Sequence, residues 1–77
     1  MIRLDSSIFT QAGALGTLDA NAFHAGLTAG DASDRIIYDS TTGNIYYDAD
    51  GNGGGAQVLF AHVTAGTALT SSDFIVI

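Results

Sequence analysis

The chain has 77 residues, a formal net charge of −6 at pH 7, no cysteine and no proline. This composition excludes disulfide bonds, and the negative charge disfavours binding to phosphate backbones and anionic membranes. Chains below about 80 residues rarely bury enough apolar surface for strong stability without a disulfide, a metal or a partner. We therefore expect a single domain over residues 1–77 that is stabilised by a metal ion, a neighbouring chain or both.

The acidic residues are of one type, because all eight are aspartate and the sequence contains neither glutamate nor lysine. Glutamate and lysine are common on the solvent-facing side of helices, whereas aspartate favours turns, caps and short-armed metal cages. An apolar fraction of 47% with four phenylalanines and three tyrosines indicates a packed domain. The composition predicts a mostly β protein that is rich in loops.

The first half of the chain predicts little regular structure. Apolar residues at positions 2 and 4 favour a short strand, and the polar residues 5–7 favour one turn after it. Residues 11–30 are mainly alanine, glycine, leucine and threonine, and Asp19 can cap one helical turn over residues 19–24. An irregular connection through residues 31–34 is expected to follow.

The second half predicts strands with more definite bounds. Residues 35–39 and 44–48 are rich in β-branched and aromatic side chains, and the Ser-Thr-Thr-Gly sequence between them predicts a hairpin with Gly43 at positive φ. Residues 56–63 predict a third strand, which we expect to be central and covered because both of its faces carry apolar residues. Residues 74–77 predict a final strand.

These elements predict a mostly β fold, a small antiparallel β-sandwich or curled sheet with one or two short helical turns. The sequence shows no N-terminal segment of the basic and apolar kind that makes a signal peptide. Its apolar runs are far shorter than the roughly 20 residues that a membrane-spanning helix needs. We therefore expect neither an N-terminal signal peptide nor a membrane span.

One loop carries the pattern of a cation site. The sequence Asp48-Ala-Asp50-Gly-Asn52-Gly53 places side-chain oxygens at alternate positions among flexible glycines. Asp48, Asp50 and Asn52 are therefore candidate calcium ligands, with carbonyls of the glycine run expected to complete the shell. The loop is no EF-hand, because the twelfth position is Leu59 and not a bidentate glutamate. The alternative, a connection in which the aspartates cap backbone amides, remains open.

The other polar candidates point less clearly to a site. Asp31, Asp34 and Asp39 could form a second cation site, although carboxylates dispersed among turn residues are more commonly solvated caps. His24 and His62 have no second ligand at the spacing of a zinc site, and cysteine ligands are absent from the sequence. Packing or surface roles are the expectation for both histidines.

The sequence predicts no enzyme. No serine lies in a Gly-x-Ser-x-Gly elbow, and no serine, histidine and acid can be grouped as a catalytic set. The glycine run of residues 51–55 lacks the Lys-Ser/Thr ending of a phosphate-binding loop, and a strand pattern follows it where such a loop requires a helix. Calcium is the one cofactor that the residues suggest.

Five segments resemble, in order and spacing, the C-terminal region of RTX-type proteins, the haemolysin-type calcium-binding family that includes serralysin-like metalloproteases and lipases. They are residues 4–9, 34–39, 44–51, 58–61 and 73–77. The chain departs from the family in one respect, because it contains no Gly-Gly-x-Gly-x-Asp repeat. The calcium sites of such repeats therefore cannot be assigned to it.

The resemblance implies a non-catalytic C-terminal module of a secreted protein. In that family this region follows a calcium-bound β-roll, which it would cap, and it carries an uncleaved signal that a type I secretion transporter reads before folding. The residues that match this signal are an acid and the apolar residues after it: Asp73, Phe74, Ile75, Val76 and Ile77. The implied location is extracellular, with calcium-dependent folding outside the cell. Any protease or lipase activity of a parent protein would lie outside these residues.

A self-standing β module for adhesion or self-assembly is the alternative. In this interpretation the edge strands and the tyrosine-bearing hairpin contact another protein. The net negative charge of the chain weighs against nucleic acid as a partner in either case.

Overall fold

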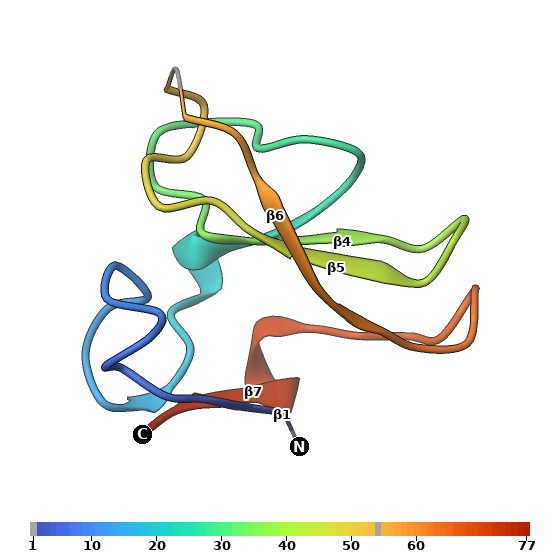
Figure 1. The fold of residues 1–77 in the computed structure, drawn as a ribbon. Coiled ribbons are helices and arrows are strands. Elements are labelled where there is room, and N and C mark those ends of the chain that lie inside the picture. Colours follow the sequence, from blue (N-terminus) through green and yellow to red (C-terminus); the bar gives the residue numbers. More distant parts are fainter. Residues whose placement is uncertain (1, 54) are drawn as a thin grey trace.

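The computed structural model describes residues 2–53 and 55–77. These residues form two small mixed sheets and two 3-10 turns, with no α-helix among them (Figure 1). The elements in chain order are β1 (Ile2–Leu4), β2 (Gly16–Thr17), η1 (Ala20–Ala22), β3 (Phe23–Ala25), β4 (Ile36–Asp39), β5 (Asn44–Tyr47), β6 (Val58–His62), η2 (Ser71–Asp73) and β7 (Phe74–Val76). The predicted mostly β fold with one or two short helical turns is confirmed.

The smaller sheet is built around the last strand. Its order is β1-β7-β2, with β7 parallel to β1 and antiparallel to β2. Backbone bonds from Ile77 N–H to the Leu4 carbonyl (2.9 Å) and from Leu18 N–H to the Phe74 carbonyl (3.1 Å) extend this pairing. The predicted final strand therefore exists, and it lies at the centre of a sheet whose other strands come from the first quarter of the chain.

The larger sheet has the order β3-β4-β5-β6 and contains the predicted hairpin. Strands β4 and β5 pair antiparallel from Ile36 opposite Tyr47 to Asp39 opposite Asn44, and Gly43 has the expected positive φ of 83°. Strand β3 pairs with β4 in parallel, as β1 does with β7. The sheets are thus mixed, which corrects the expectation of antiparallel pairing throughout.

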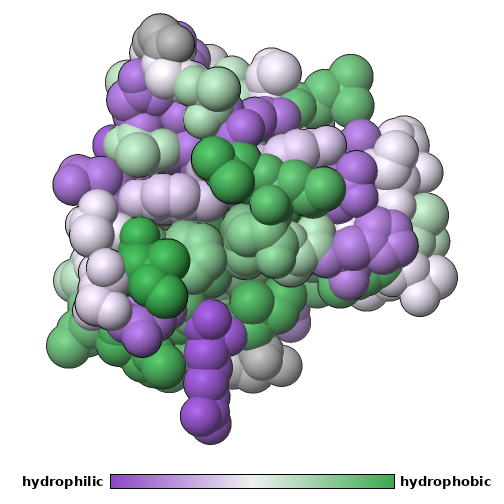
Figure 2. All heavy atoms as spheres, in the orientation of Figure 1, coloured by the Kyte–Doolittle hydropathy of each residue, from purple (hydrophilic) through white to green (hydrophobic). Residues whose placement is uncertain are grey.

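Strand β6 is an edge strand, which corrects the prediction that it is central and covered. Among the described residues it pairs with β5 alone, and the register shifts between Ile45 and Tyr46, opposite Ala61 and Leu59. Side chains of Val58 and Leu59 are 60% and 53% exposed, and Figure 2 shows apolar side chains gathered on this face of the molecule. A bulge of this kind twists an edge away from further pairing, so apolar residues can stand on both faces of an uncovered strand.

The core lies between the two sheets. Ile36, Tyr38 and Ile45 of the larger sheet belong to one buried cluster with Leu4 and Phe74 of the smaller one. Alternate residues of a strand share a face, so residues 36 and 38 point to this core, whereas residue 37 and the residues paired with it lie on the opposite face. That opposite face of the larger sheet carries the candidate site.

Candidate functional site

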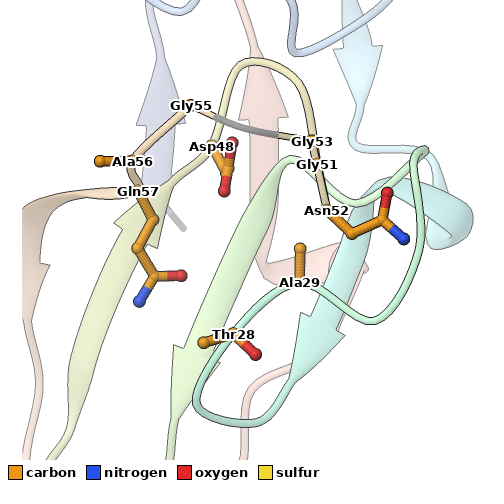
Figure 3. Close-up of a pocket in the computed structure, with 9 residues that line it drawn as sticks. All are labelled: Thr28, Ala29, Asp48, Gly51, Asn52, Gly53, Gly55, Ala56 and Gln57. Atoms are coloured by element: carbon orange, nitrogen blue, oxygen red, sulfur yellow. The ribbon is translucent and has the colours of Figure 1, made fainter.

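Two loops border an open hollow of about 440 Å³ at one end of the larger sheet. One loop comprises residues 26–35, between β3 and β4, and the other comprises residues 48–57, between β5 and β6. Side chains from both loops line it, among them Thr28 and Ala29 from the first and Asp48, Asn52 and Gln57 from the second (Figure 3). The structure thus gives the predicted cation loop a partner loop that the sequence did not indicate.

Backbone contacts hold the two loops together. The Asn52 N–H donates to the Asp31 carbonyl at 3.1 Å. Gly51 has a positive φ of 65°, and a Cβ at this position would lie 2.6 Å from the carbonyl oxygens of both Asp31 and Ala32. Only glycine allows this approach, because any side chain would collide with backbone that has no freedom to move away. The glycine of the Asp50-Gly51 pair therefore serves the contact between the loops.

Asp34 anchors the first loop from inside. Its carboxylate is buried and accepts hydrogen bonds from the N–H groups of Gly30 (2.7 Å) and Asp31 (3.2 Å). The same Oδ2 atom lies 3.5 Å from Nδ1 of His24 on β3. A carboxylate that accepts this many donors organises the loop, which accounts for both Asp34 and His24.

The proposed second cation site is not assembled. Asp31 accepts hydrogen bonds from Ser33, and these lower the pKa of its carboxyl. Asp39 accepts from Thr41 and Thr42, which lower the pKa of Asp39 in the same way. Within residues 2–53 and 55–77 no three histidine, cysteine, aspartate or glutamate side chains gather in a group that could hold a metal. These aspartates act as local caps of turns.

Asp48 differs from the other aspartates of the chain. It is 5% exposed, and among the described residues its carboxylate accepts one hydrogen bond, from the Asp50 N–H to Oδ1 at 3.3 Å. Burial raises the pKa of Asp48, and the neighbouring Asp50 carboxylate raises it further. Raised pKa values of this origin mark a negative charge that lacks enough compensation in the folded chain.

Asp50 and Asn52 have separate roles in the loop. Asp50 is exposed, and its Oδ2 accepts from the Gly55 N–H at 2.8 Å, which lowers the pKa of its carboxyl. Asn52 lines the hollow together with Asp48. The structure therefore brings two of the three predicted ligands to the hollow and turns the third toward a backbone amide. Gly54, whose carbonyl belongs to the run expected to complete the shell, lies outside the described residues.

Gln57 is a polar residue of the hollow that sequence reasoning did not identify. Its Nε2 donates to the Leu27 carbonyl at 3.0 Å. Its Oε1 is buried and has no hydrogen-bond partner among the described residues. No sequence signal marks this residue, because a glutamine at the start of a strand pattern is ordinary and its hydrogen bond to the first loop joins residues distant in the sequence.

The candidate secretion residues lie in the smaller sheet. Asp73 closes a capping box in η2, where its Oδ2 accepts from the Thr70 N–H at 2.7 Å. Phe74 and Val76 are 0% and 1% exposed, whereas Ile77 is half exposed. The segment thus alternates between the core and the surface as an ordinary inner strand does.

Comparisons with known proteins give no relative. No protein-family model, curated protein or solved structure matches this chain. In the part of the chain that the structure describes, no helix has the length and apolar character needed to cross a bilayer.

Proposed function

We propose that this chain is a non-catalytic C-terminal module of a larger secreted RTX-type protein. In this proposal residues 73–77 are the element that a type I transporter reads, and the module folds outside the cell and caps an upstream calcium-bound β-roll. The observation that supports it best is the place of β7, which is the central strand of the smaller sheet. The family assignment rests on the five sequence segments described above.

The position of β7 separates export from folding. Phe74 and Val76 are buried in the core cluster, and β1 and β2 flank the strand on both sides. A transporter could not contact these side chains in the folded domain, so it must read them in the unfolded chain. The same residues then become indispensable to the fold, because removing them takes away the strand that joins β1 to β2.

Calcium supplies the step that favours folding outside the cell. At low calcium concentration the buried Asp48 carboxylate and the net charge of −6 both oppose the compact state. An ion that binds only the folded state stabilises it by about 2.7 kcal/mol when its concentration is 100 times its Kd. Millimolar calcium outside the cell would therefore shift the chain toward the folded state after export.

An export assay tests the proposal. The chain is fused behind a reporter protein in cells that express a type I transporter, and reporter in the medium is measured. We expect removal of residues 74–77 to abolish export. The matched control is Ile45→Ala, which disrupts the core without altering the last strand, and it should be exported as well as the unaltered chain. Equal export of the truncated chain would contradict the proposal.

Adhesion or self-assembly is the second candidate function, and the exposed edge of β6 favours it. Val58 and Leu59 stand on this edge, where apolar side chains would be buried by a neighbouring molecule. Sedimentation velocity in calcium-free buffer tests this function. A dimer that forms with increasing concentration and is lost in the Leu59→Lys variant would support it, and a monomer at every concentration would exclude self-assembly through β6.

A further inference from the structure

We propose that the hollow between the two loops binds one calcium ion through the Asp48 carboxylate, the Gln57 side-chain oxygen and neutral oxygens of residues 48–53. Asp50 positions the loop and does not contact the ion. This inference rests on the calcium-dependent step of the proposed function and is independent of the export step. It replaces the ligand set that the alternating sequence pattern suggested.

Asp48 carries a charge that the described residues compensate weakly. Its carboxylate is buried, and in the described part of the chain its hydrogen bonding is limited to the 3.3 Å contact with Asp50 N–H. The positive charge of Arg35 acts on this carboxylate, but the two groups share no hydrogen bond among the described residues, and Nη1 of Arg35 donates to the carbonyls of Ala32 (2.7 Å) and Asp34 (3.0 Å). Buried carboxylates are normally paired with a cation or with several donors, whereas residues 2–53 and 55–77 give Asp48 one long hydrogen bond and no ion pair.

The side-chain oxygen of Gln57 also faces the hollow, and this residue does not belong to the aspartate pattern of residues 48–52. The bond from Nε2 to the Leu27 carbonyl fixes which end of the amide is oxygen, since a carbonyl accepts and cannot donate. Oε1 is consequently a buried acceptor with no donor among the described residues. Figure 3 shows this oxygen on the side of the hollow where the Thr28 and Asp48 side chains lie. Two oxygens that need a positive partner therefore border one space.

The chemistry of the lining selects the ion. Asp48, Asn52 and Gln57 offer oxygen from side chains, and none of the described lining residues carries sulfur or imidazole, so the site suits a hard cation. Calcium tolerates the irregular geometry of a glycine-rich loop, whereas magnesium requires near-octahedral ligands. Because one carboxylate is the sole charged ligand, we expect weak binding, with a Kd of about 10⁻⁴–10⁻³ M, as in extracellular calcium modules.

The test is a calcium titration of the EDTA-treated, ¹⁵N-labelled chain followed by NMR. We expect the side-chain NH₂ signals of Gln57 and Asn52 to shift and saturate in the millimolar range, with no saturable shift in magnesium. Asp48→Asn keeps the shape of the side chain and should weaken calcium binding at least about tenfold, because it removes the sole charged ligand. Asp19→Asn makes the same charge change on an exposed cap far along the chain and should leave the Kd unaltered.

Two further variants separate ligands from supporting residues. Gln57→Glu places a carboxylate at the proposed ligand position and should tighten calcium binding roughly tenfold, because affinity rises with the number of charged ligands. Asp50→Asn retains an oxygen that can accept from Gly55 N–H and should keep the Kd within about threefold. Loss of binding in Asp50→Asn equal to that in Asp48→Asn would overturn the assignment of Asp50.

The proposed site would be wrong if the Gln57 NH₂ signals do not shift during the calcium titration, because an ordered water would then be the only partner of Oε1. It is also overturned if Asp48→Asn binds calcium as tightly as the unaltered chain. If calcium still raises the melting temperature of Asp48→Asn, the ion binds elsewhere in the chain. The proposed site would then be wrong, but calcium-dependent folding would still hold. Failure of the export assay alongside normal calcium binding would contradict the proposed function alone.

Discussion

Asp39 is the last residue of β4, and Asp48 directly follows the last residue of β5. The two aspartates are buried to nearly the same extent, with 6% and 5% of their surface exposed. Their surroundings differ. Asp39 accepts from Thr41 N–H (3.0 Å), Thr41 Oγ1 (2.6 Å) and Thr42 Oγ1 (3.0 Å), which lower the pKa of its carboxyl. In the described part of the chain the Asp48 carboxylate accepts only the 3.3 Å hydrogen bond from Asp50 N–H, and burial raises its pKa.

The comparison shows that burial alone does not decide what an aspartate does. Three donors make Asp39 the organiser of its own turn, and it needs nothing from outside the chain. Asp48 is buried to a similar extent and receives one donor among the described residues, which is why we propose that its charge is available to a cation. Identical residues at equal burial can therefore be structural in one turn and a candidate ligand in the next, and the count of nearby donors separates the two cases.

The largest effect is expected from breaking the Asp39 turn at its glycine. In Gly43→Ala the new Cβ would collide with the Val63 carbonyl, and φ is positive as well, so we expect a loss of about 3 kcal/mol or more. Gly66→Ala is the control, because φ is nearly the same (85°) but no atom lies within 4 Å, and it should cost about 1 kcal/mol. Urea denaturation measures both, and equal losses would show that the collision is relieved.

The same substitution in the two aspartates should have opposite effects. In calcium-free buffer Asp39→Asn should lower the melting temperature by about 5–10 °C, because the amide cannot accept from all three donors. Asp48→Asn removes a buried charge at constant shape and should raise the melting temperature by a few degrees. Circular dichroism at pH 7 in EDTA measures both values. A decrease in both variants would remove the distinction between the turns.

The pH dependence sharpens the comparison further. The pKa of Asp48 is raised on folding, so its stabilising contribution exists at low pH and is lost as pH rises through the pKa of the folded state. The higher melting temperature expected for Asp48→Asn should therefore return to that of the unaltered chain on acidification. The pKa of Asp39 is lowered, so its contribution exists at neutral pH and is lost as pH falls through the folded value. In melting curves from neutral to acid pH, the Asp48→Asn difference should disappear first. The reverse order would contradict these pKa directions.

The smallest effect concerns one donor of the Asp39 turn. Thr42→Val removes the Oγ1 bond to Asp39 and the 3.3 Å bond that Oγ1 accepts from Asn44 N–H, and it keeps the shape of the side chain. We expect a decrease in the melting temperature of about 3 °C. Thr28→Val, which places the same change on the hollow, should leave the calcium-free melting temperature within about 1 °C. Equal decreases in the two variants would mean that the hydrogen bond of the Thr42 hydroxyl to Asp39 does not stabilise the turn.

Local patterns carried the correct predictions. Ser-Thr-Thr-Gly set the hairpin turn, Asp19 caps η1 through the Asn21 N–H, and residues 74–76 form the last strand. The strands β2 and β3 were missed because they are two and three residues long and obtain their pairing from distant segments. Their sequences, Gly-Thr and Phe-His-Ala, carry no strand signal of their own.

The lining of the hollow was predictable from the sequence only where it depends on local alternation along the loop. Asp48 and Asn52 reach the hollow because alternation along residues 48–52 is a local property of the loop. Asp50 breaks the pattern because Gly55 N–H competes for its carboxylate. Gln57 could not be predicted from the sequence, since its side chain is oriented by a hydrogen bond to Leu27, thirty residues away.

The most direct measurement is the melting temperature of the chain in EDTA and in 10 mM calcium at pH 7, for the unaltered sequence and for Asp48→Asn. We expect calcium to raise the melting temperature of the unaltered chain by several degrees and to leave that of Asp48→Asn unchanged. If the unaltered chain melts at the same temperature in both buffers, the claim that the Asp48 carboxylate binds calcium is contradicted. The burial of Asp48 would then only lower the stability of the fold.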